Sequence, residues 1–109
     1  MTVKELCEQL QLKVIVKGEQ GKTVAGGYTG DLLSWVMARL PEDAVWLTVM
    51  GNINTVAVAS LKDAACIILT DSAPLDEDAQ KKAQQQGIPV FSSPKSSFEL
   101  GAELARILR

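Results

Sequence analysis

Residues 44–50 of the chain read AVWLTVM, and two later apolar runs resemble this stretch, ACIIL at 65–69 and IPVF at 88–91. Each run is followed at once by small polar residues, and a segment with helical character comes after them. The followers are Gly51-Asn52-Ile53-Asn54, Thr70-Asp71-Ser72 and Ser92-Ser93-Pro94. Alternating apolar runs and helices are typical of a parallel sheet with helical crossovers. Such a sheet collects its loops at the carboxyl ends of the strands.

The remaining elements follow from local signals. The capping box Thr2-x-x-Glu5 predicts a helix over about 3–11, and β-branched residues predict a strand over 12–17. A second short strand or extended segment is expected at 22–25, broken by the glycine pair 26–27.

Later elements show equally local signals. Apolar residues from Leu32 to Leu40 share one helical face, with Thr29 or Asp31 as the cap and Pro41 as the end. Residues 54–61 favour a helix packed on a sheet, although a strand fits them too. Residues 76–86 predict a polar helix ended by Gly87, and a second capping box opens a last helix that runs to about residue 108.

These elements predict one α/β domain over residues 1–109. We expect three layers, with helices on both faces of a mostly parallel or mixed sheet of about five strands. With 109 residues, the chain is long enough for a single core.

Composition excludes several classes of function. The net charge is −2 and there is no basic stretch, so we expect no binding to nucleic acid. No apolar run approaches the roughly 20 residues that cross a bilayer, so we expect no membrane insertion. The charged N-terminus does not resemble a signal peptide, which predicts a cytoplasmic protein.

Cys7 and Cys66 have no metal-site spacing; we expect Cys66 in the core and no disulfide between them.

The chain offers little catalytic machinery. It contains no histidine, which excludes histidine triads and histidine metal sites. The segment Gly18-Glu19-Gln20-Gly21-Lys22-Thr23 ends like a phosphate-binding loop, but its glycines are too close and no helix follows, so we interpret it as a turn. We therefore expect no catalytic residues, no metal and no cofactor.

The polar residues after the strands are the candidate ligand site, because parallel strands bring them to one end of the sheet. Two purely structural alternatives remain open: helix capping by Asn52 or Asn54, and a tight turn at 26–31 where two backbone segments pass closely. Trp46 is expected in the core, and Trp35 is expected partly exposed as an interface anchor. The candidate ligand-binding residues are Gly27, Tyr28, Thr29, Asn52, Asn54, Thr70, Asp71, Ser92 and Ser93.

Most of the chain resembles the DRTGG domain family. The resemblance is carried by DLLSWVM at 31–37, NTVAVA at 54–59, ACIILT at 65–70 and AQQQGIPV at 83–90. Members are small α/β modules, alone or attached to phosphotransacetylases and to pyrophosphatases with CBS domains, and their fold is similar to the N-terminal domain of HPr kinase/phosphorylase. The resemblance implies a regulatory or assembly unit, often dimeric, without catalysis. The five residues that name the family are absent here, and so is the phosphate loop of the kinase, so neither transfers a role to this chain.

Three functions remain open. The first is a non-catalytic regulatory module that forms a homodimer and senses a small, nucleotide-like ligand at the carboxyl ends of the strands. The second is an interaction module without a ligand, which docks a partner protein through a surface that includes Trp35. The third is an enzyme such as a phosphotransferase fragment.

Overall fold

The computed structural model describes residues 1–108, which form five helices and five strands. In chain order the elements are α1 (Val3–Gln9), β1 (Lys13–Val16), β2 (Gly26–Thr29), α2 (Leu33–Arg39), β3 (Ala44–Thr48), α3 (Ile53–Leu61), β4 (Cys66–Leu69), α4 (Glu77–Gln86), β5 (Val90–Ser92) and α5 (Ser97–Ile107). No helix within this range is long and apolar enough to span a bilayer.

The strands form one mixed sheet in the order β1-β5-β4-β3-β2. Strands β2 to β5 are parallel, and β1 joins β5 antiparallel at one side. The register aligns Trp46 of β3 with Tyr28 of β2 and with Ile67 of β4. The predicted mixed sheet of about five strands is confirmed.

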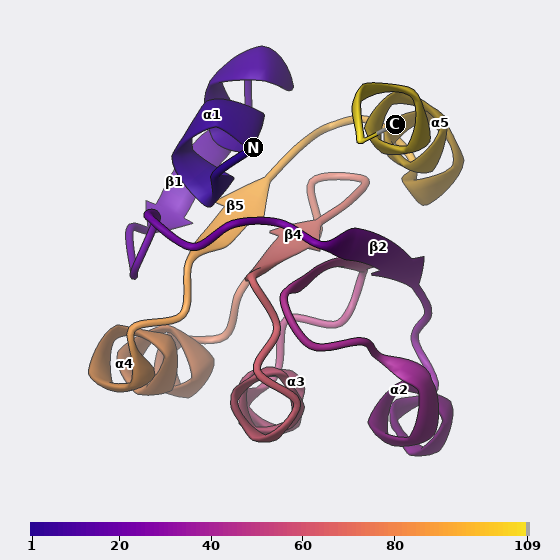
Figure 1. Cartoon of the computed structure of the whole chain (residues 1–109). Helices are drawn as coiled ribbons and strands as arrows, with labels where there is room; N and C mark the ends of the chain where they lie inside the picture. The colour runs from indigo at the N-terminus through magenta and orange to yellow at the C-terminus, as the bar shows by residue number, and fades with distance from the viewer. Residues whose placement is uncertain (109) are drawn as a thin grey trace.

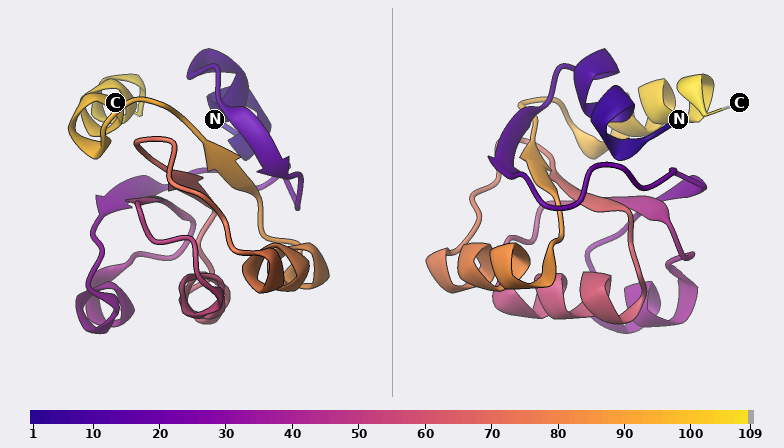
Figure 2. Two further views of the ribbon diagram at one scale, coloured as in Figure 1. Left: turned by 180° about the vertical axis from the view of Figure 1, so that it is seen from behind. Right: turned by 60° about the vertical axis from the view of Figure 1, so that its left-hand side comes forward.

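The helices form two layers around this sheet. Helices α2, α3 and α4 cover one face, and α1 and α5 cover the other (Figures 1 and 2). Each of α2, α3 and α4 connects one parallel strand to its immediate neighbour, always stepping in the same direction across the sheet. The parallel strands therefore contain no point where the winding reverses, which is where doubly wound folds open their binding crevice.

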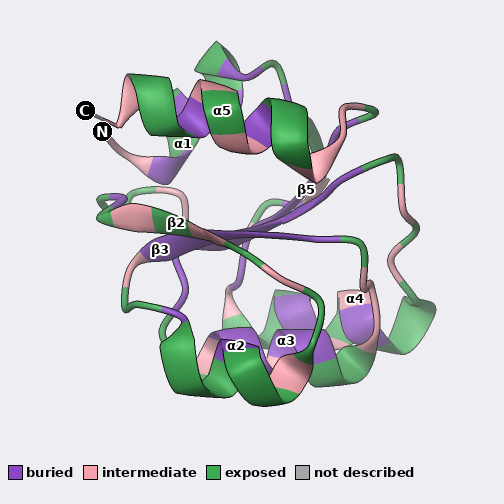
Figure 3. Ribbon diagram, turned by 90° about the vertical axis from the view of Figure 1, so that its right-hand side faces the viewer, coloured by how far each residue is buried: buried purple, intermediate pink, exposed green. Residues whose placement is uncertain are grey.

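Apolar side chains on the two faces of the sheet build two cores. Trp46 is fully buried among the residues beneath α2, α3 and α4, and its indole Nε1 donates a 2.9 Å hydrogen bond to the Gly30 carbonyl. Phe91 is buried on the other side, with Leu6 of α1 and Leu100 of α5. Figure 3 shows the central strands buried between helices whose outer surfaces are exposed. The expected position of Trp46 in the core is confirmed.

The prediction for the glycine pair 26–27 was wrong, because the pair expected to break the chain begins β2. Of the two alternatives for residues 22–25, a strand does not form, and only an isolated bridge joins Thr23 to Thr2. Backbone pairing with β3 overrides the low strand propensity of glycine. A Cβ on Gly27 would lie only 2.7 Å from Leu104 Cδ2, so glycine allows α5 to pack closely on β2.

The expected cap of the next helix was also wrong. Helix α2 begins after Leu32, without a side-chain cap, and Asp31 binds the end of β3 instead. The segment at 54–61 is a helix, which removes the strand alternative. Both capping boxes are present, with Thr2 and Ser96 as the N-caps. Other element boundaries differ from the predictions by one or two residues.

Candidate functional site

The predicted polar residues do meet at the carboxyl end of the parallel strands. The backbone N–H of Thr70 donates to the Thr48 carbonyl at 3.1 Å, and the N–H of Ser72 donates to the Ser93 carbonyl at 2.9 Å. The Asp71 N–H reaches the Lys95 carbonyl at 2.9 Å. The loops after β3, β4 and β5 are thus tied to one another at this end of the sheet.

Three of the predicted side chains at this end, those of Asn52, Thr70 and Ser93, bind other groups of the protein. Thr70 Oγ1 shares a 2.7 Å hydrogen bond with Ser97 Oγ, and Ser93 Oγ accepts the Lys95 N–H at 3.2 Å. Asn52 Oδ1 accepts the Thr55 N–H at 3.0 Å, so Asn52 is the N-cap of α3, which is the structural alternative predicted for it. These bonds order the loops and occupy groups that a ligand would need.

Asp31 and Thr48 complete this network, and sequence reasoning assigned them no role at this end of the sheet. One carboxylate oxygen of Asp31 accepts from Thr48 Oγ1 at 2.7 Å and from the Val49 N–H at 3.1 Å. Thr48 is fully buried and also accepts the Met50 N–H at 3.2 Å. The available signal was a threonine within an otherwise apolar strand, since a buried hydroxyl needs a partner.

The other predicted residues belong to the edge strand β2 and to helix α3. Gly27, Tyr28 and Thr29 belong to β2, and Asn54 is exposed in the first turn of α3. Beside β2 there is a hollow of about 180 Å³, lined by Gly27, Tyr28, Thr29, Leu47, Gly101, Leu104, Ala105 and Leu108. Binding of a ligand by the nine residues stays a prediction.

A larger cleft, of about 540 Å³, opens at the opposite end of the sheet, where the parallel strands begin. We call it the amino-end cleft. The segment from β1 to β2, which crosses in front of β5 and β4 in Figure 1, forms one wall, and the ends of α3 and α4 form the others. It is lined by Glu19, Gly21, Lys22, Ala59, Ser60, Asp63, Ala64, Ala65, Gln86, Gly87, Ile88 and Pro89. None of these is among the predicted site residues, and the sequence from Gly18 to Thr23 predicts only a turn.

The one ammonium group that lines the amino-end cleft is engaged with the protein. Lys22 Nζ lies 3.0 Å from Asp43 Oδ1 and donates to the Asp63 carbonyl oxygen at 3.2 Å. Glu19 Oε1 accepts the Gly21 N–H at 2.8 Å, and Ser60 Oγ donates to Gln86 Oε1 at 3.2 Å. The Asp63 carboxylate is solvent-accessible on an exposed residue.

Nothing in residues 1–108 offers a ready metal centre or reactive thiol. No group of three His, Cys, Asp or Glu residues in this range could hold a metal ion. Cys7 and Cys66 are free and buried. Burial raises the pKa of the Cys66 thiol far above its usual range and also raises the pKa of Cys7, so both stay protonated near neutrality.

The fold and the chain's sequence define a small α/β module, and comparison with known families identifies it further. Residues 5–107 match the family model for the DRTGG domain. The chain therefore belongs to the DRTGG domain family, as its sequence resemblance implied. Comparison with curated proteins finds no match to this chain.

A solved structure has the same fold. It is the regulatory region of a Clostridium perfringens pyrophosphatase, with CBS and DRTGG domains, complexed with its activator diadenosine tetraphosphate. The match has 14% sequence identity and a TM-score of 0.70, and it covers 94% of this chain and 45% of that chain. The present chain thus spans less than half of the neighbour.

Proposed function

We propose that this DRTGG domain is a non-catalytic regulatory module that works by pairing with a second copy of itself. The pairing surface, which we call the β2-side face, consists of the outer side of β2, Trp35 and Arg39 of α2, and Phe98, Ala102 and Ala105 of α5. The observation that carries the proposal is an unprotected edge strand with an exposed aromatic side chain on the helix at either side.

The two edge strands of the sheet differ in protection. Strand β1 carries Lys13 and has an irregular register between Val14 and Val16, two features that discourage further strand pairing. Strand β2 has the sequence GGYT, pairs only with β3, and carries neither lysine nor proline. An open edge of this kind can add a strand from another chain.

The outer face of α5 suits close packing against another helix. Phe98 is 86% exposed, and Ala102 and Ala105 follow it at intervals of four and three residues on the face turned away from buried Leu100 and Leu104. Small side chains let a second helix approach closely.

Charge favours a second copy of α5 in the antiparallel direction. If the symmetry axis passes near Ala102, Phe98 lies at the level of Ala105 and Arg106 of the other copy. Glu99 then comes within reach of Arg106 of the other copy, twice by symmetry.

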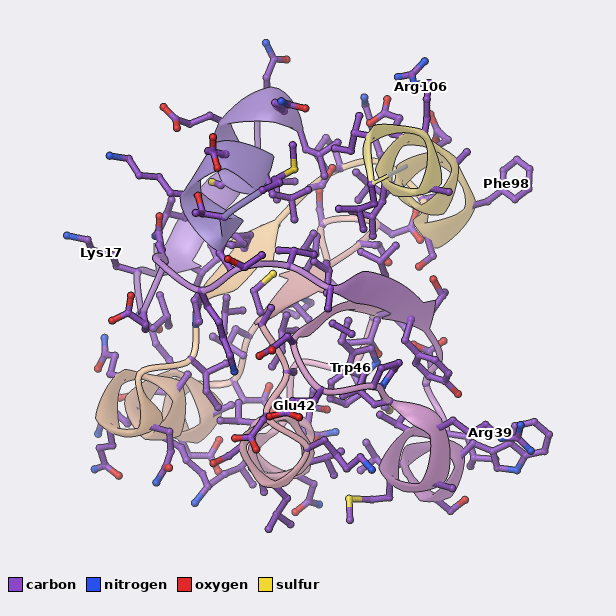
Figure 4. All side chains as sticks on the ribbon, viewed as in Figure 1. Lys17, Arg39, Glu42, Trp46, Phe98 and Arg106 are labelled. Atoms are coloured by element: carbon purple, nitrogen blue, oxygen red, sulfur yellow. The ribbon has the colours of Figure 1, made fainter. Side chains whose placement is uncertain are left out.

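Helix α2 extends the surface on the far side of β2. Trp35 is 56% exposed, as expected for a partly exposed indole, and the Arg39 guanidinium lies 4.3 Å from the centre of its ring. Figure 4 shows Phe98 and Arg39 pointing outward on the same side of the molecule, with β2 between their helices. Tryptophan and arginine are the residues most enriched at the energetic centres of interfaces.

Strand β2 and helix α5 lie side by side at their middles. A single two-fold axis can pair both elements with their copies only if they are placed in this way. A Cβ on Gly27 would lie 2.7 Å from Leu104, and a Cβ on Gly101 would lie 4.0 Å from Thr29 Oγ1. The middle of β2 is therefore beside the middle of α5. One axis through Tyr28 can pair the two strands and the two helices together, and a stable interface needs such combined area, about 800 Å² per partner.

Light scattering with sedimentation measurements tests this pairing. We expect a dimer for the unchanged chain and monomers for Phe98→Asp and for Trp35→Asp. Each change would bury a charge within the interface, on one of the two helices that flank β2. The matched control is Leu61→Asp, which alters another exposed apolar residue, 72% exposed at the end of α3, and should leave the dimer intact.

The proposal fails if the unchanged chain is monomeric up to about 1 mM, which corresponds to only about −4 kcal/mol of association free energy. It also fails if Leu61→Asp dissociates the dimer as strongly as Phe98→Asp does. In that case the association would be non-specific.

A nucleotide-like ligand at the carboxyl ends of the strands is the second part of the proposal. It is supported by the neighbouring structure, whose regulatory region is complexed with diadenosine tetraphosphate. Thermal unfolding with this compound and with ATP tests it, since a ligand that binds only the folded state raises the melting temperature. Asp71→Asn should reduce the shift while tolerating the positive φ of 54° at this position. No shift with either compound would remove the ligand from the proposal and leave the interaction module alone.

A further inference from the structure

We propose that the amino-end cleft is a binding site for a small organic cation, namely a protonated amine on a compact carbon skeleton. This site is separate from the pairing surface and from the polar rim at the carboxyl end of the sheet.

The cleft has the size and floor of a small-molecule site. Its volume of about 540 Å³ lies within the range of about 300–1,000 Å³ that is common for ligand pockets. The floor is made of short or rigid apolar side chains, Ala59, Ala64 and Pro89, all of which are buried. Such a floor can cover the carbon skeleton of a ligand without closing the space above it.

Helices α3 and α4 both end at this cleft, and the end of α4 lacks the usual positive charge. Lys62 is the C-cap of α3, whereas α4 ends at Gly87 with no basic residue in its last turn. The carbonyl end of a helix bears a partial negative charge, which a cation normally compensates. Ser60, Gln86 and Gly87 at these two helix ends line the cleft, so their partial charges act on its contents.

Two carboxylates add to this negative field. Glu19 uses Oε1 for the Gly21 N–H, which leaves its second oxygen for a ligand, and Asp63 lines the same cleft. Lys22 does not cancel them, because its ammonium group lies against Asp43 Oδ1 at 3.0 Å and the Asp63 carbonyl at 3.2 Å.

This charge arrangement selects the class of ligand. A phosphate or carboxylate would face two carboxylates and the carbonyl end of α4, which repel it, and the one cation in the lining, Lys22, is already held by Asp43. A protonated amine would find carboxylate and amide oxygens as acceptors, while the alanine floor covers its carbon chain. The cleft therefore favours an amine over a nucleotide phosphate.

Isothermal titration calorimetry with agmatine and with n-butylamine as probes tests this site, with AMP as the anionic comparison. We expect saturable one-to-one binding of at least one amine and none of AMP. The double variant Glu19→Gln/Asp63→Asn should weaken amine binding about tenfold, because it removes both carboxylates and keeps their shapes. Asparagine also tolerates the positive φ of 53° at position 63.

The matched control removes the same number of charges elsewhere. Glu8→Gln/Glu77→Gln changes two exposed acids outside the cleft and should leave amine binding unchanged.

Ser60→Phe, with the fold checked by circular dichroism, should fill the cleft and abolish binding. The proposal is overturned if neither amine binds saturably, if the control pair weakens binding as much as the cleft pair, or if Ser60→Phe folds and still binds. Dimerisation, measured by light scattering, is expected to be the same in all these variants, so the two proposals fail separately.

Discussion

The two ends of the parallel strands contrast in how their polar groups are used. At the carboxyl end, two pairs of side chains form hydrogen bonds of 2.7 Å, Thr48 with Asp31 and Thr70 with Ser97. At the amino end, a cleft of about 540 Å³ is lined by carboxylates and helix ends, and its ion pair between Lys22 and Asp43 is about one-third exposed on each side. At the end that the sequence favours as a site, several polar side chains are already bound to the protein, whereas the opposite end carries the larger cleft.

This difference shows that a concentration of polar residues does not by itself mark a binding site. Buried polar groups must find partners, and after folding the nearest partners are other loops of the protein. A ligand site also needs space. We therefore expect the loss of a side-chain contact at the carboxyl end to reduce stability strongly and the loss of one at the amino end to reduce it little.

Gly51→Ala, at the carboxyl end, should have the largest effect on stability. A Cβ at this position would overlap the Pro74 carbonyl oxygen, which is backbone and cannot easily move. We expect a loss of about 3 kcal/mol in the free energy of unfolding, measured by urea denaturation. Gly26→Ala is the control, because a Cβ there meets nothing within 4 Å, and it should change stability little. Equal effects of the two changes would contradict the close approach at Gly51.

Thr48→Val should have the next largest effect. The change keeps the shape of a fully buried side chain but removes its hydroxyl from the Asp31 carboxylate and the Met50 N–H. We expect a loss of about 2 kcal/mol by the same denaturation measurement. Thr23→Val, on an exposed residue, serves as the control. A loss below that of the control would mean that the rim is not held by this network, and the contrast between the two ends would disappear.

Lys22→Met should cost much less, although it also breaks a contact of 3.0 Å. The pair with Asp43 is about one-third exposed on both sides, so water screens it. We expect a loss of about 0.5 kcal/mol, which falls further when salt is added. A loss as large as that of Thr48→Val would show that the amino end is as tightly built as the carboxyl end.

The smallest effect near neutral pH should come from Cys66, which lies in β4 between the two ends. Burial raises the pKa of this thiol in the folded state, whereas in the unfolded chain it ionises near about 8.5. Because the folded state holds the proton more tightly, this contribution to stability is complete below that pH and is lost as the pH rises above it. Urea denaturation from neutral to alkaline pH should show this decline in the unchanged chain and a shallower one in Cys66→Ala. Identical slopes would refute the assignment to Cys66.

The local signals predicted much of the fold. The apolar runs around Trp46, Ile67 and Val90 became β3, β4 and β5 because continuous apolar strands fit only a sheet covered on both faces. Both capping boxes formed because their hydrogen bonds lie within four residues. The strand at Gly26 was missed because no local preference supports it; pairing with β3 creates it.

The candidate site was less predictable for the same reason. Sequence reasoning could place Asp71 and Ser93 at one end of the sheet, because parallel strands share a direction. It could not tell that the end would be bridged by contacts such as Thr70 with Ser97, which are 27 residues apart. It also could not bring Glu19 to Asp63 and Gln86 around one cleft, since that requires the path of three separate segments in space.

The sequence by itself determined the class of fold, the family and the residues that fill the core, because periodicity, capping and apolar runs act over short distances along the chain. Only the tertiary structure decided which strand edge stays open, which polar groups bind each other and where a cleft remains. These properties depend on distances between segments remote in sequence, and those distances are set by packing across the sheet.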